Sequence, residues 1–233
     1  MPEKKLDLLR TAPWRRHELL QVMPNAWAAV LAVRSLGEIP VLNTWADRGW
    51  PVIVRRRMDG DDISMVPVGV PLPPVVGKSR IAVNVPPEAV IARAAPPGLR
   101  SAARAAQPAW QSTIAALLAL GEQHGIEPAA FGSLLWQHLT GLSYLSPTSD
   151  LDLIWPAHAS CDVGRLLDGI ARIELAAPMR IDGEIVSPQG AAVNWRELRK
   201  ALGEGDCGQV LVKSMNGARV LHAPYLPSCE HVQ

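Results

Sequence analysis

The chain has 233 residues, 48% of them hydrophobic, and a formal net charge of +1. This length and apolar content are enough to bury a core in one large domain or in two smaller ones. The near-neutral charge provides no general basic surface, so binding of nucleic acid through many phosphate contacts is not indicated. A phosphorylated ligand would have to be bound by a local cluster of charges.

The cysteines and the distribution of apolar residues indicate a cytoplasmic protein. Cys161, Cys207 and Cys229 are odd in number and widely spaced, which favours reduced thiols over a disulfide framework or a zinc cluster. The N-terminal residues include acids and lack an apolar run of signal-peptide length, and no stretch reaches the ~18 apolar residues of a membrane span. We therefore expect neither export nor membrane insertion.

The first part of the chain is expected to form a small α+β domain. Trp14 is followed by three nitrogen-bearing side chains, which we interpret either as a turn anchored by the indole or as a contact for ligand phosphates. Helical spacing predicts helices over 26–36 and 41–47, and apolar runs predict strands over 50–54, 65–70 and 80–85. Prolines in and around the last two strands place them at sheet edges or strand ends.

Basic side chains gather beside these strands. Arg55 and Arg57 follow the strand 50–54 and would share one face of an extended chain, while Lys78 and Arg80 lie on the turn between the two strands predicted over 65–70 and 80–85. A guanidinium suits phosphate oxygens, although runs of charge are commonly only solvated. The four residues are therefore candidate contacts for ligand phosphates or for an acidic carrier protein, with an ordinary exposed strand end as the alternative.

Two proline pairs mark a boundary between domains. Pro86-Pro87 and Pro96-Pro97 enclose a segment, 88–95, that could form a short helix. Paired prolines of this kind are typical of a semi-rigid hinge between folded units. We expect a first domain over residues 1–90 and a second over 98–233.

The second domain is predicted to combine helices with a sheet. Helices are expected from residue 108 to 121 or 125, over 163–173, and over 194–202 with Asn194 as its cap. Strands are expected over 129–131, 150–155 and 179–185, and the segments 209–214 and 218–222 form a predicted hairpin around Asn216-Gly217.

Gly132 and Ser133 open a short helical pattern in this domain. Apolar side chains follow them at helical spacing, and Gly141 can close the last turn. Ser133 is the candidate N-cap. A helix start with glycine before it offers free backbone N–H groups, and the missing side chain lets a phosphate come close. Such a dipeptide alone is usually only a turn and a cap.

Asp150 and Asp152 follow at alternate positions of a predicted strand, so their carboxylates point the same way while Leu151, Leu153 and Trp155 point the other. Neighbouring carboxylates repel each other unless a cation or a shared proton intervenes, and oxygen-rich sites suit Mg²⁺ that also holds phosphates. An isolated Asp-x-Asp is usually a solvated strand edge. The glycine-serine and the acidic pair, in this order, together predict a phosphate-and-metal site.

This order of motifs resembles the nucleotidyltransferase superfamily. The fuller string, over 132–137, 139–142 and 149–153, is similar to a narrower family, the phosphoribosyl-dephospho-CoA transferases of malonate decarboxylase, also called its holo-acyl-carrier-protein synthases. The loop 141–149 is longer than expected of the superfamily and belongs to the narrower pattern. The resemblance implies an α+β protein, in which a small N-terminal α+β domain precedes a polymerase-beta-like mixed-sheet domain.

The resemblance also implies a reaction. A phosphoribosyl-dephospho-CoA group would pass from triphosphoribosyl-dephospho-CoA to a serine of the malonate decarboxylase acyl carrier protein, with release of pyrophosphate. Gly132 and Ser133 would hold the terminal phosphates, and Asp150 and Asp152 would bind two Mg²⁺ ions, with Mn²⁺ as the alternative metal. No nucleic acid or membrane partner is implied.

Two further residues are candidates for this site. The superfamily takes a third metal carboxylate from a strand at the position of 179–185, where Asp182 is our candidate and Glu184 its competitor. A hairpin turn at Asp182-Gly183 is the alternative interpretation, because Asp-Gly is a common turn pair. Lys213 would neutralise the triphosphate or the leaving pyrophosphate, or else is a solvent-facing strand lysine.

Two other functions fit the same residues. A nucleotidyltransferase that transfers a nucleotide from a nucleoside triphosphate to a protein, an RNA or a small molecule would have nearly the same site. A catalytically idle protein that only binds the carrier or the prosthetic group is disfavoured, because both carboxylates and the glycine-serine are present.

Overall fold

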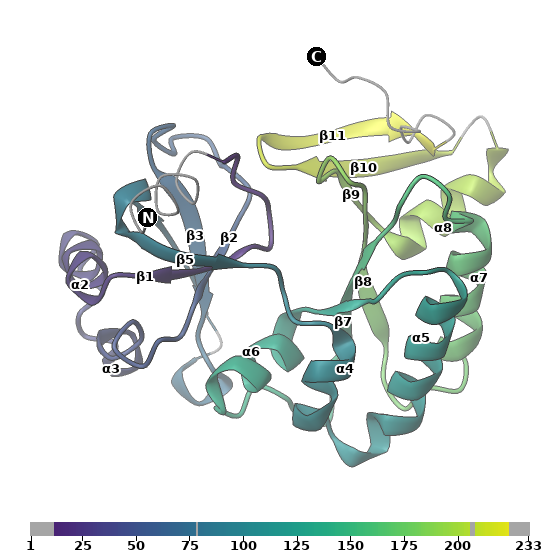
Figure 1. Ribbon diagram of the computed structural model, residues 1–233, viewed down its shortest axis with the longest axis horizontal. Helices are drawn as coiled ribbons and strands as arrows, with labels where there is room; N and C mark the ends of the chain where they lie inside the picture. The colour runs from purple at the N-terminus through teal and green to yellow at the C-terminus, as the bar shows by residue number, and fades with distance from the viewer. Residues whose placement is uncertain (1–11, 78, 206–207, 224–233) are drawn as a thin grey trace, which may run out of the picture. The chain divides into compact units, whose positions relative to one another are not determined.

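Each of two units in the computed structural model is built on its own β-sheet (Figure 1). The structure describes residues 12–77, 79–205 and 208–223. Unit 1 comprises residues 1–96 and 215–217, and unit 2 comprises 97–214 and 218–233. The expected α+β class, with an N-terminal domain followed by a C-terminal sheet domain, is confirmed. Among the described residues, no helix has both the length and the apolar character that a membrane span requires.

Unit 1 is built on a five-stranded antiparallel sheet in the order β4-β3-β2-β1-β5. Two tryptophans anchor its short helices: Trp27 joins α2 to α3, and Trp45 joins the end of α3 to the chain before β2. Trp27 and Trp45 are almost completely buried, and their indole N–H groups donate to the carbonyls of Leu42 and Pro51, which satisfies the polar end of each ring. The elements are β1 (Leu19–Val22), α2 (Pro24–Val33), α3 (Pro40–Asn43), β2 (Val52–Val54), β3 (Val66–Pro71), η1 (Pro74–Val76), β4 (Arg80–Val85), η2 (Pro87–Ala89) and β5 (Val90–Ala94).

Several expectations for unit 1 are wrong in detail. The segment 88–95 is no helix: the turn η2 leads into β5, which pairs with β1, a strand that the sequence did not predict. The second helix, α3, spans only four residues and ends before 47. β3 is an interior strand although it contains Pro67. The ring is tolerated because β2 ends beside Val68, and the Pro67 carbonyl still accepts a hydrogen bond from the Arg55 N–H.

Unit 2 is built on a six-stranded mixed sheet in the order β11-β10-β9-β8-β7-β6. β7 and β8 pair in parallel. The pairings of β6 with β7, of β8 with β9 and of β9 with β10 are antiparallel. The strands are β6 (Ala129–Ala130), β7 (Leu151–Pro156), β8 (Ile181–Val186), β9 (Ala192–Asn194), β10 (Gln209–Ser214) and β11 (Gly217–His222). Every predicted strand and the hairpin are present, and β9 is an additional strand.

The helices of unit 2 follow the predicted pattern closely. Asn194 caps the last helix by accepting from the N–H groups of Arg196 and Glu197, as expected, and Gly141 ends α6 with a φ of 71°. The short helix α4 was not predicted. The elements are α4 (Leu99–Ala102), η3 (Ala103–Ala105), η4 (Pro108–Trp110), α5 (Gln111–Gln123), α6 (Gly132–Thr140), α7 (Val163–Glu174) and α8 (Trp195–Gly203).

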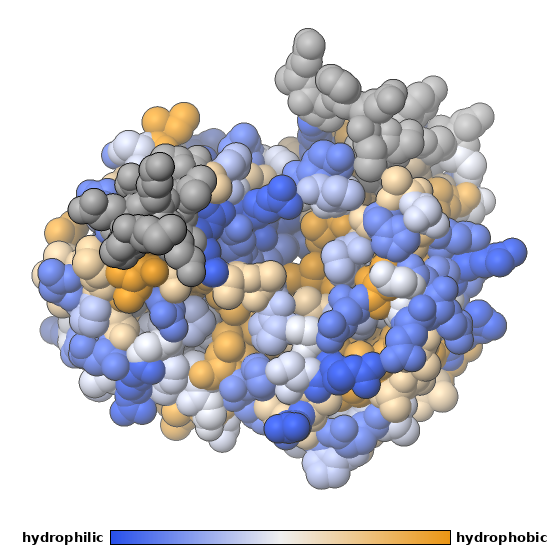
Figure 2. Space-filling view, viewed as in Figure 1, coloured by the Kyte–Doolittle hydropathy of each residue, from blue (hydrophilic) through white to orange (hydrophobic). Residues whose placement is uncertain are grey.

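The core of unit 2 decides which way the acidic strand faces. Leu151, Leu153 and Trp155 of β7 lie in one buried cluster with apolar side chains of α5, α7 and α8, the helices beside the strands in Figure 1. Because side chains alternate along a strand, Asp152 lies on the opposite face. On the view in Figure 2, hydrophobic residues form separate patches among hydrophilic ones.

We predict that Gly183→Ala destabilises unit 2 by about 1–3 kcal/mol, the cost of holding a non-glycine residue in a forbidden backbone region. Gly183 has a φ of 147°, and a Cβ there would lie 2.0 Å from the carbonyl oxygen of Leu153. That oxygen belongs to the paired strand and has little freedom to move.

The free energy of unfolding, measured by urea denaturation, checks this prediction. Gly203→Ala is the matched control, because it lies in unit 2 at the end of α8 with no atom within 4 Å of the added Cβ. The control should stay within about 1 kcal/mol of the wild type. Equal stability of both variants would contradict the packing described for β7 and β8.

Candidate functional site

Gly132 and Asp152 are in direct contact where α6 begins. The N–H of Phe131 donates to the backbone oxygen of Asp152 at 3.0 Å. Gly132 has a φ of 57°, and a Cβ added there would lie 1.9 Å from Oδ2 of Asp152. Glycine is needed for both the left-handed backbone and the space. The first turn of α6 is thus held against the carboxylate of Asp152.

Ser133 is not the N-cap that the sequence suggested. The helix begins at Gly132, the capping position is Phe131, and no side chain caps the first turn. The left-handed conformation of Gly132 places the start of the helix ahead of the serine. Ser133 therefore lies inside the first turn, close to the backbone N–H groups that an α-helix leaves without intrahelical partners.

The parallel pairing of β7 with β8 brings Asp182 of β8 beside Asp152 of β7. The register places Asp152 opposite Asp182, and Leu153 opposite Gly183. Since neighbouring strands lie about 4.8 Å apart and partners in register share a face, the two carboxylates stand side by side. Asp182 and Gly183 both lie inside β8, so the hairpin-turn interpretation of this pair is wrong.

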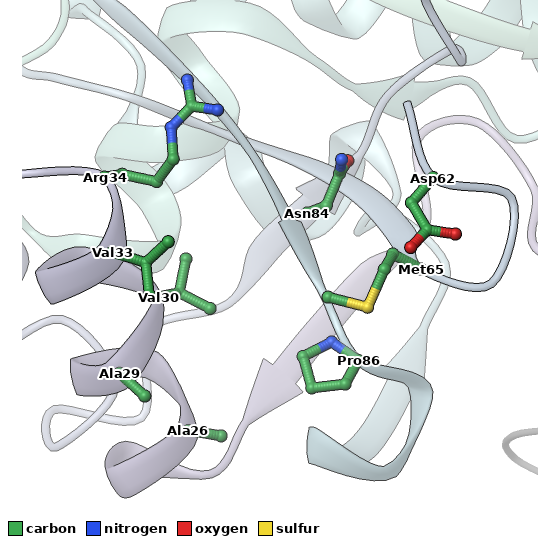
Figure 3. A pocket seen from close by; sticks show the side chains of 9 residues that line it. All are labelled: Ala26, Ala29, Val30, Val33, Arg34, Asp62, Met65, Asn84 and Pro86. Carbon is green, nitrogen blue, oxygen red and sulfur yellow. The ribbon is translucent and has the colours of Figure 1, made fainter. Parts of the chain in front are cut away.

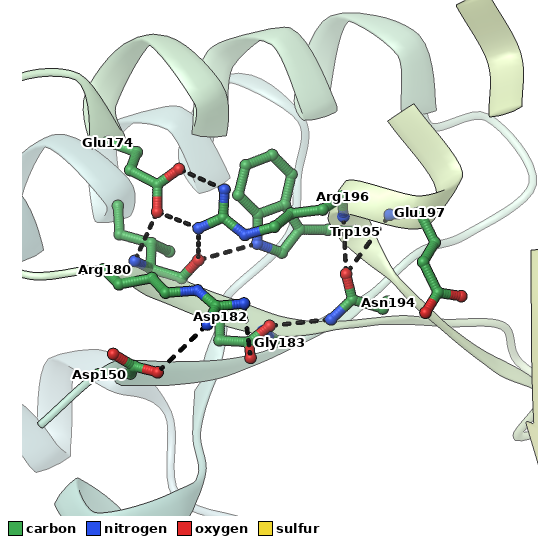
Figure 4. A network of polar contacts seen from close by, with 10 residues as sticks. Asp150, Glu174, Arg180, Asp182, Gly183, Asn194, Trp195, Arg196 and Glu197 are labelled. Atoms are coloured by element: carbon green, nitrogen blue, oxygen red, sulfur yellow. Dashed lines mark hydrogen bonds and ion pairs between the residues drawn. The ribbon is translucent and has the colours of Figure 1, made fainter. Parts of the chain in front are cut away.

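The Arg180 guanidinium lies between two of the three aspartates (Figure 4). Its Nη1 is 3.9 Å from Oδ2 of Asp150, and its Nη2 is 3.7 Å from Oδ2 of Asp182. The other oxygen of Asp182 accepts hydrogen bonds of 2.8 Å from the side-chain amide of Asn194 and from the N–H of Gly183. One oxygen of Asp182 is therefore fixed by the protein, while the other faces Arg180.

A second arginine beside the site has a structural role. Arg196 forms an ion pair with Glu174 and donates to the Ile181 carbonyl at 2.7 Å. Burial acts to raise the pKa of Glu174, but hydrogen bonds from Arg196 and from the N–H of Ile181 outweigh it and hold this pKa below its usual value. The hydrogen bond from Arg196 to Glu174 in turn raises the pKa of the guanidinium. This pair fixes the start of β8.

Lys213 and Glu184 form an ion pair. The Lys213 Nζ lies 2.9 Å from Oε1 of Glu184. Glu184 is on the same face of β8 as Asp182, but its partner on β7 is Ile154, whereas Asp182 is opposite Asp152. This register favours Asp182 over Glu184 as the third carboxylate of the site.

The chemistry of the donors suits a hard cation. Asp150, Asp152 and Asp182 offer only oxygen atoms, which Mg²⁺ prefers, and Gly132 keeps the approach to Asp152 clear of a side chain. Within the described residues, no three acidic, histidine or cysteine side chains gather closely enough to hold a metal ion as they stand. The guanidinium of Arg180 occupies the space between Asp150 and Asp182.

The basic residues proposed for unit 1 have different surroundings. Arg55 makes two hydrogen bonds to Asp61, of 2.6 and 2.7 Å, and a third to Asn84. Arg57 donates to three carbonyls of the loop 62–65. Arg80 begins β4 and is exposed, and Lys78 lies outside the described residues. Arg55 and Arg57 thus have structural contacts, and a role for the four in substrate binding stays a prediction.

Unit 1 also contains a hollow of about 480 Å³. Figure 3 shows Val30 and Val33 of α2 on one side and Met65, Asn84 and Pro86 on the other. This volume is in the range of small-molecule sites. None of the basic residues predicted to bind substrate lines it.

Two residues of the site were not assigned by sequence reasoning. Asn194 was assigned only as a helix cap, yet its oxygen caps α8 while its nitrogen holds Asp182. Arg180 shares an alternation with Asp182 that is visible in the sequence. Its position beside Asp150, however, follows from the pairing of β7 with β8, which places Leu151 opposite Ile181.

Comparison with known proteins identifies the family. The model of the phosphoribosyl-dephospho-CoA transferase MdcG N-terminal domain matches residues 15–96, and that of the C-terminal domain matches residues 98–224. The phosphoribosyl-dephospho-CoA transferase of Bradyrhizobium diazoefficiens is 40% identical over 204 residues, covering 87% of this chain and 88% of the relative. That of Xanthomonas euvesicatoria is 38% identical over 207 residues, covering 88% and 93%. No solved structure matches the chain.

The relatives are transferases, and this class of enzyme agrees with a site that combines a helix start with carboxylates. The chain belongs to the phosphoribosyl-dephospho-CoA transferase family. The resemblance inferred from residues 132–153 is thereby confirmed, and it extends over both units. The likeness of the second domain to polymerase-beta-like nucleotidyltransferases stays a prediction.

We predict that Gly132→Ala costs more stability than Gly125→Ala. Both glycines have a left-handed backbone, with φ of 57° and 65°, so each alanine should lose about 1–2 kcal/mol. At Gly132 the added Cβ would also lie 1.9 Å from the carboxylate of Asp152, whereas at Gly125 the nearest atom is 3.5 Å away. The steric clash should therefore add to the loss of stability only at Gly132.

Urea unfolding of the two variants measures the difference, which should exceed about 1 kcal/mol, the typical cost of forcing extra volume into a packed site. Equal losses would contradict the contact between Gly132 and Asp152.

We predict that Asp61→Asn destabilises unit 1 by about 1–3 kcal/mol at pH 7, because it breaks charge-assisted hydrogen bonds from Arg55. Those bonds hold the pKa of Asp61 well below its usual value. A carboxyl whose pKa is lower in the folded state contributes stability above its unfolded pKa of about 3.9 and loses it as the pH falls further.

The difference between wild type and variant should therefore narrow as the pH is lowered from 7 to 3. Hydrogen exchange of the β2 and β3 amides reports the stability of this unit at both pH values. A difference that stays constant across this range would contradict the assigned ion pair.

Proposed function

We propose that the protein transfers the phosphoribosyl-dephospho-CoA group from triphosphoribosyl-dephospho-CoA to a serine of the malonate decarboxylase acyl carrier protein and releases pyrophosphate. One observation carries the proposal: in a chain of this family, Asp152 stands opposite Asp182 with Gly132 packed against its carboxylate. Family membership supports the transferred group, and the site supports the type of reaction.

The proposed reaction is a phosphoryl substitution. The serine oxygen of the carrier attacks the phosphorus next to the ribose, a new P–O bond forms, the bond to the departing pyrophosphate breaks, and the hydroxyl proton is released. Catalysis of such a step depends on positioning and on stabilising charge at the phosphate oxygens. No side chain of the enzyme needs to be modified covalently.

Asp150, Asp152 and Asp182 would hold Mg²⁺, with Mn²⁺ as the alternative, and the metal would supply positive charge for the phosphate oxygens and for the attacking hydroxyl. The first turn of α6, with Gly132 and Ser133, would donate backbone N–H groups to the terminal phosphates. Asn194 would keep Asp182 oriented by the hydrogen bond to its Oδ1.

The remaining contacts would come from basic residues. Lys213 would serve the phosphates only by leaving Glu184 or by sharing it, because the two are paired at 2.9 Å. In unit 1, exposed Arg80 is a better candidate for the dephospho-CoA moiety or the carrier than Arg55 and Arg57, whose guanidinium groups already have partners.

We also propose a cytoplasmic location. Cys161 is a free thiol, and its burial raises its pKa, which makes it a poorly reactive thiol. Cys207 and Cys229 lie outside the described residues.

The transfer itself is tested by intact mass spectrometry of the apo carrier subunit after incubation with enzyme and Mg²⁺. One tube receives triphosphoribosyl-dephospho-CoA and a parallel tube receives ATP. A mass gain equal to phosphoribosyl-dephospho-CoA, with that donor alone, is the expected result. A gain of AMP would indicate a nucleotidyltransferase that uses nucleoside triphosphates, and no gain in either tube would favour a binding protein.

We predict that Asp152→Asn and Asp182→Asn each lower the rate of transfer by at least about 100-fold, the loss typical of removing one group that stabilises transition-state charge. Asp168→Asn is the matched control. Asp168 lies on the exposed surface of α7 and pairs with Arg199 of α8, so removing its charge should leave the rate of transfer unchanged.

The same assay on Glu184→Gln decides the third carboxylate. If Glu184→Gln lowers the rate of transfer as much as Asp152→Asn does, and Asp182→Asn transfers at the normal rate, Glu184 rather than Asp182 is the third carboxylate. Circular dichroism of each variant checks that the fold is intact.

A further inference from the structure

Arg180 differs from the neighbouring arginine in how firmly it is held. Its two contacts with Asp150 and Asp182, at 3.9 and 3.7 Å, are longer than hydrogen bonds, and its side chain is 56% exposed. Within the described residues, its guanidinium makes no hydrogen bond. Arg196, in contrast, is fixed by Glu174 and by the Ile181 carbonyl. Exposed ion pairs of this length are weak and contribute little to stability.

The charges around the three aspartates explain why a loosely held arginine matters. The positive charge of Arg196 is balanced by Glu174, and that of Lys213 by Glu184. Among the described residues, Arg180 is the basic residue that faces Asp150 and Asp182, and its ion pairs with them are both long. A polyphosphate brought to these carboxylates would be repelled unless positive charge accompanies it.

We infer that Arg180 is a substrate-binding residue that alternates between two partners. In the free protein, its guanidinium neutralises Asp150 and Asp182 from the space between them. When a metal ion enters that space, the guanidinium leaves the carboxylates and binds phosphate oxygens of the donor and of the departing pyrophosphate. This inference rests on the proposed function and adds to it the residue that receives the polyphosphate.

The geometry and chemistry of the side chain support both positions. Arg180 precedes β8 directly, so its backbone is fixed by the hydrogen bond that its carbonyl accepts from the N–H of Leu151. The long side chain can then turn while its origin stays in place. A guanidinium carries five N–H donors in a planar fork that matches two phosphate oxygens, and it keeps its charge at every physiological pH.

The test uses inorganic tripolyphosphate as the probe and isothermal titration calorimetry as the measurement, with no transfer reaction involved. In Mg²⁺, Arg180→Ala should bind tripolyphosphate about tenfold more weakly than the wild type, because a charge-assisted contact is lost. In EDTA it should also bind more weakly, because Asp150 and Asp182 are left without this neutralising cation and repel the anion. Arg180→Lys should lie between the two, since it keeps the charge but not the fork.

A second titration, with Mg²⁺ alone, measures how strongly Arg180 competes with the metal ion for the aspartates. Arg180→Ala should bind Mg²⁺ at least about threefold more tightly than the wild type, because the guanidinium no longer competes for Asp150 and Asp182. Arg100→Ala is the control for loss of an exposed arginine: Arg100 pairs with Glu122 at 2.6 Å and should change neither affinity.

The outcomes separate this inference from the proposed function. Unchanged tripolyphosphate affinity in Arg180→Ala, or unchanged Mg²⁺ affinity, would overturn the exchange of partners. If Mg²⁺ neither binds the wild type nor strengthens its binding of tripolyphosphate, the metal-dependent function fails together with the exchange. Weaker tripolyphosphate binding by Arg180→Ala in EDTA would then show only that the charge of Arg180 favours anion binding. A wild type that does not bind tripolyphosphate would contradict both.

Discussion

The parallel pairing of β7 with β8 is the constraint on which the site depends. A register that places Asp152 opposite Asp182 puts two carboxylates on one face, while the apolar side chains of β7 are buried on the other. A shift by one residue would turn Asp152 toward the core and Leu153 toward solvent. The buried cluster therefore fixes the position of the acidic residues, although none of them belongs to it.

Short-range contacts then fix each carboxylate. Gly132 lets the start of α6 approach Asp152 without a side chain between them. Asn194 holds one oxygen of Asp182 and caps α8 at the same time. The Glu174–Arg196 pair ties α7, the start of β8 and α8 together. Placing like charges side by side costs free energy. These contacts hold the carboxylates in place despite their mutual repulsion.

The sequence predicted those features that depend on local pattern. The alternation in 150–155 showed that Asp152 faces away from Leu151 and Leu153, and Asn216-Gly217 marked the hairpin of β10 and β11. Gly141 and Asn194 marked helix ends for local steric and hydrogen-bonding reasons. The motif order also indicated the family, which the comparisons confirmed.

Features that depend on long-range pairing could not be predicted in the same way. The segment 90–94 is compatible with a helix by composition, but its pairing with β1 makes it a strand. Arg55 is one of three consecutive arginines, and only the folded loop shows that Asp61 is its partner. The place of Arg180 beside Asp150 likewise follows from the sheet register rather than from any spacing in the sequence.

Anomalous diffraction from crystals grown with Mn²⁺ and tripolyphosphate would test the central claim most directly, because it locates the metal without relying on activity. Our account predicts a manganese peak within coordinating distance of Asp150, Asp152 and Asp182, with the guanidinium of Arg180 turned to the phosphate. A peak bound by other residues, or tripolyphosphate bound away from the start of α6, would contradict it.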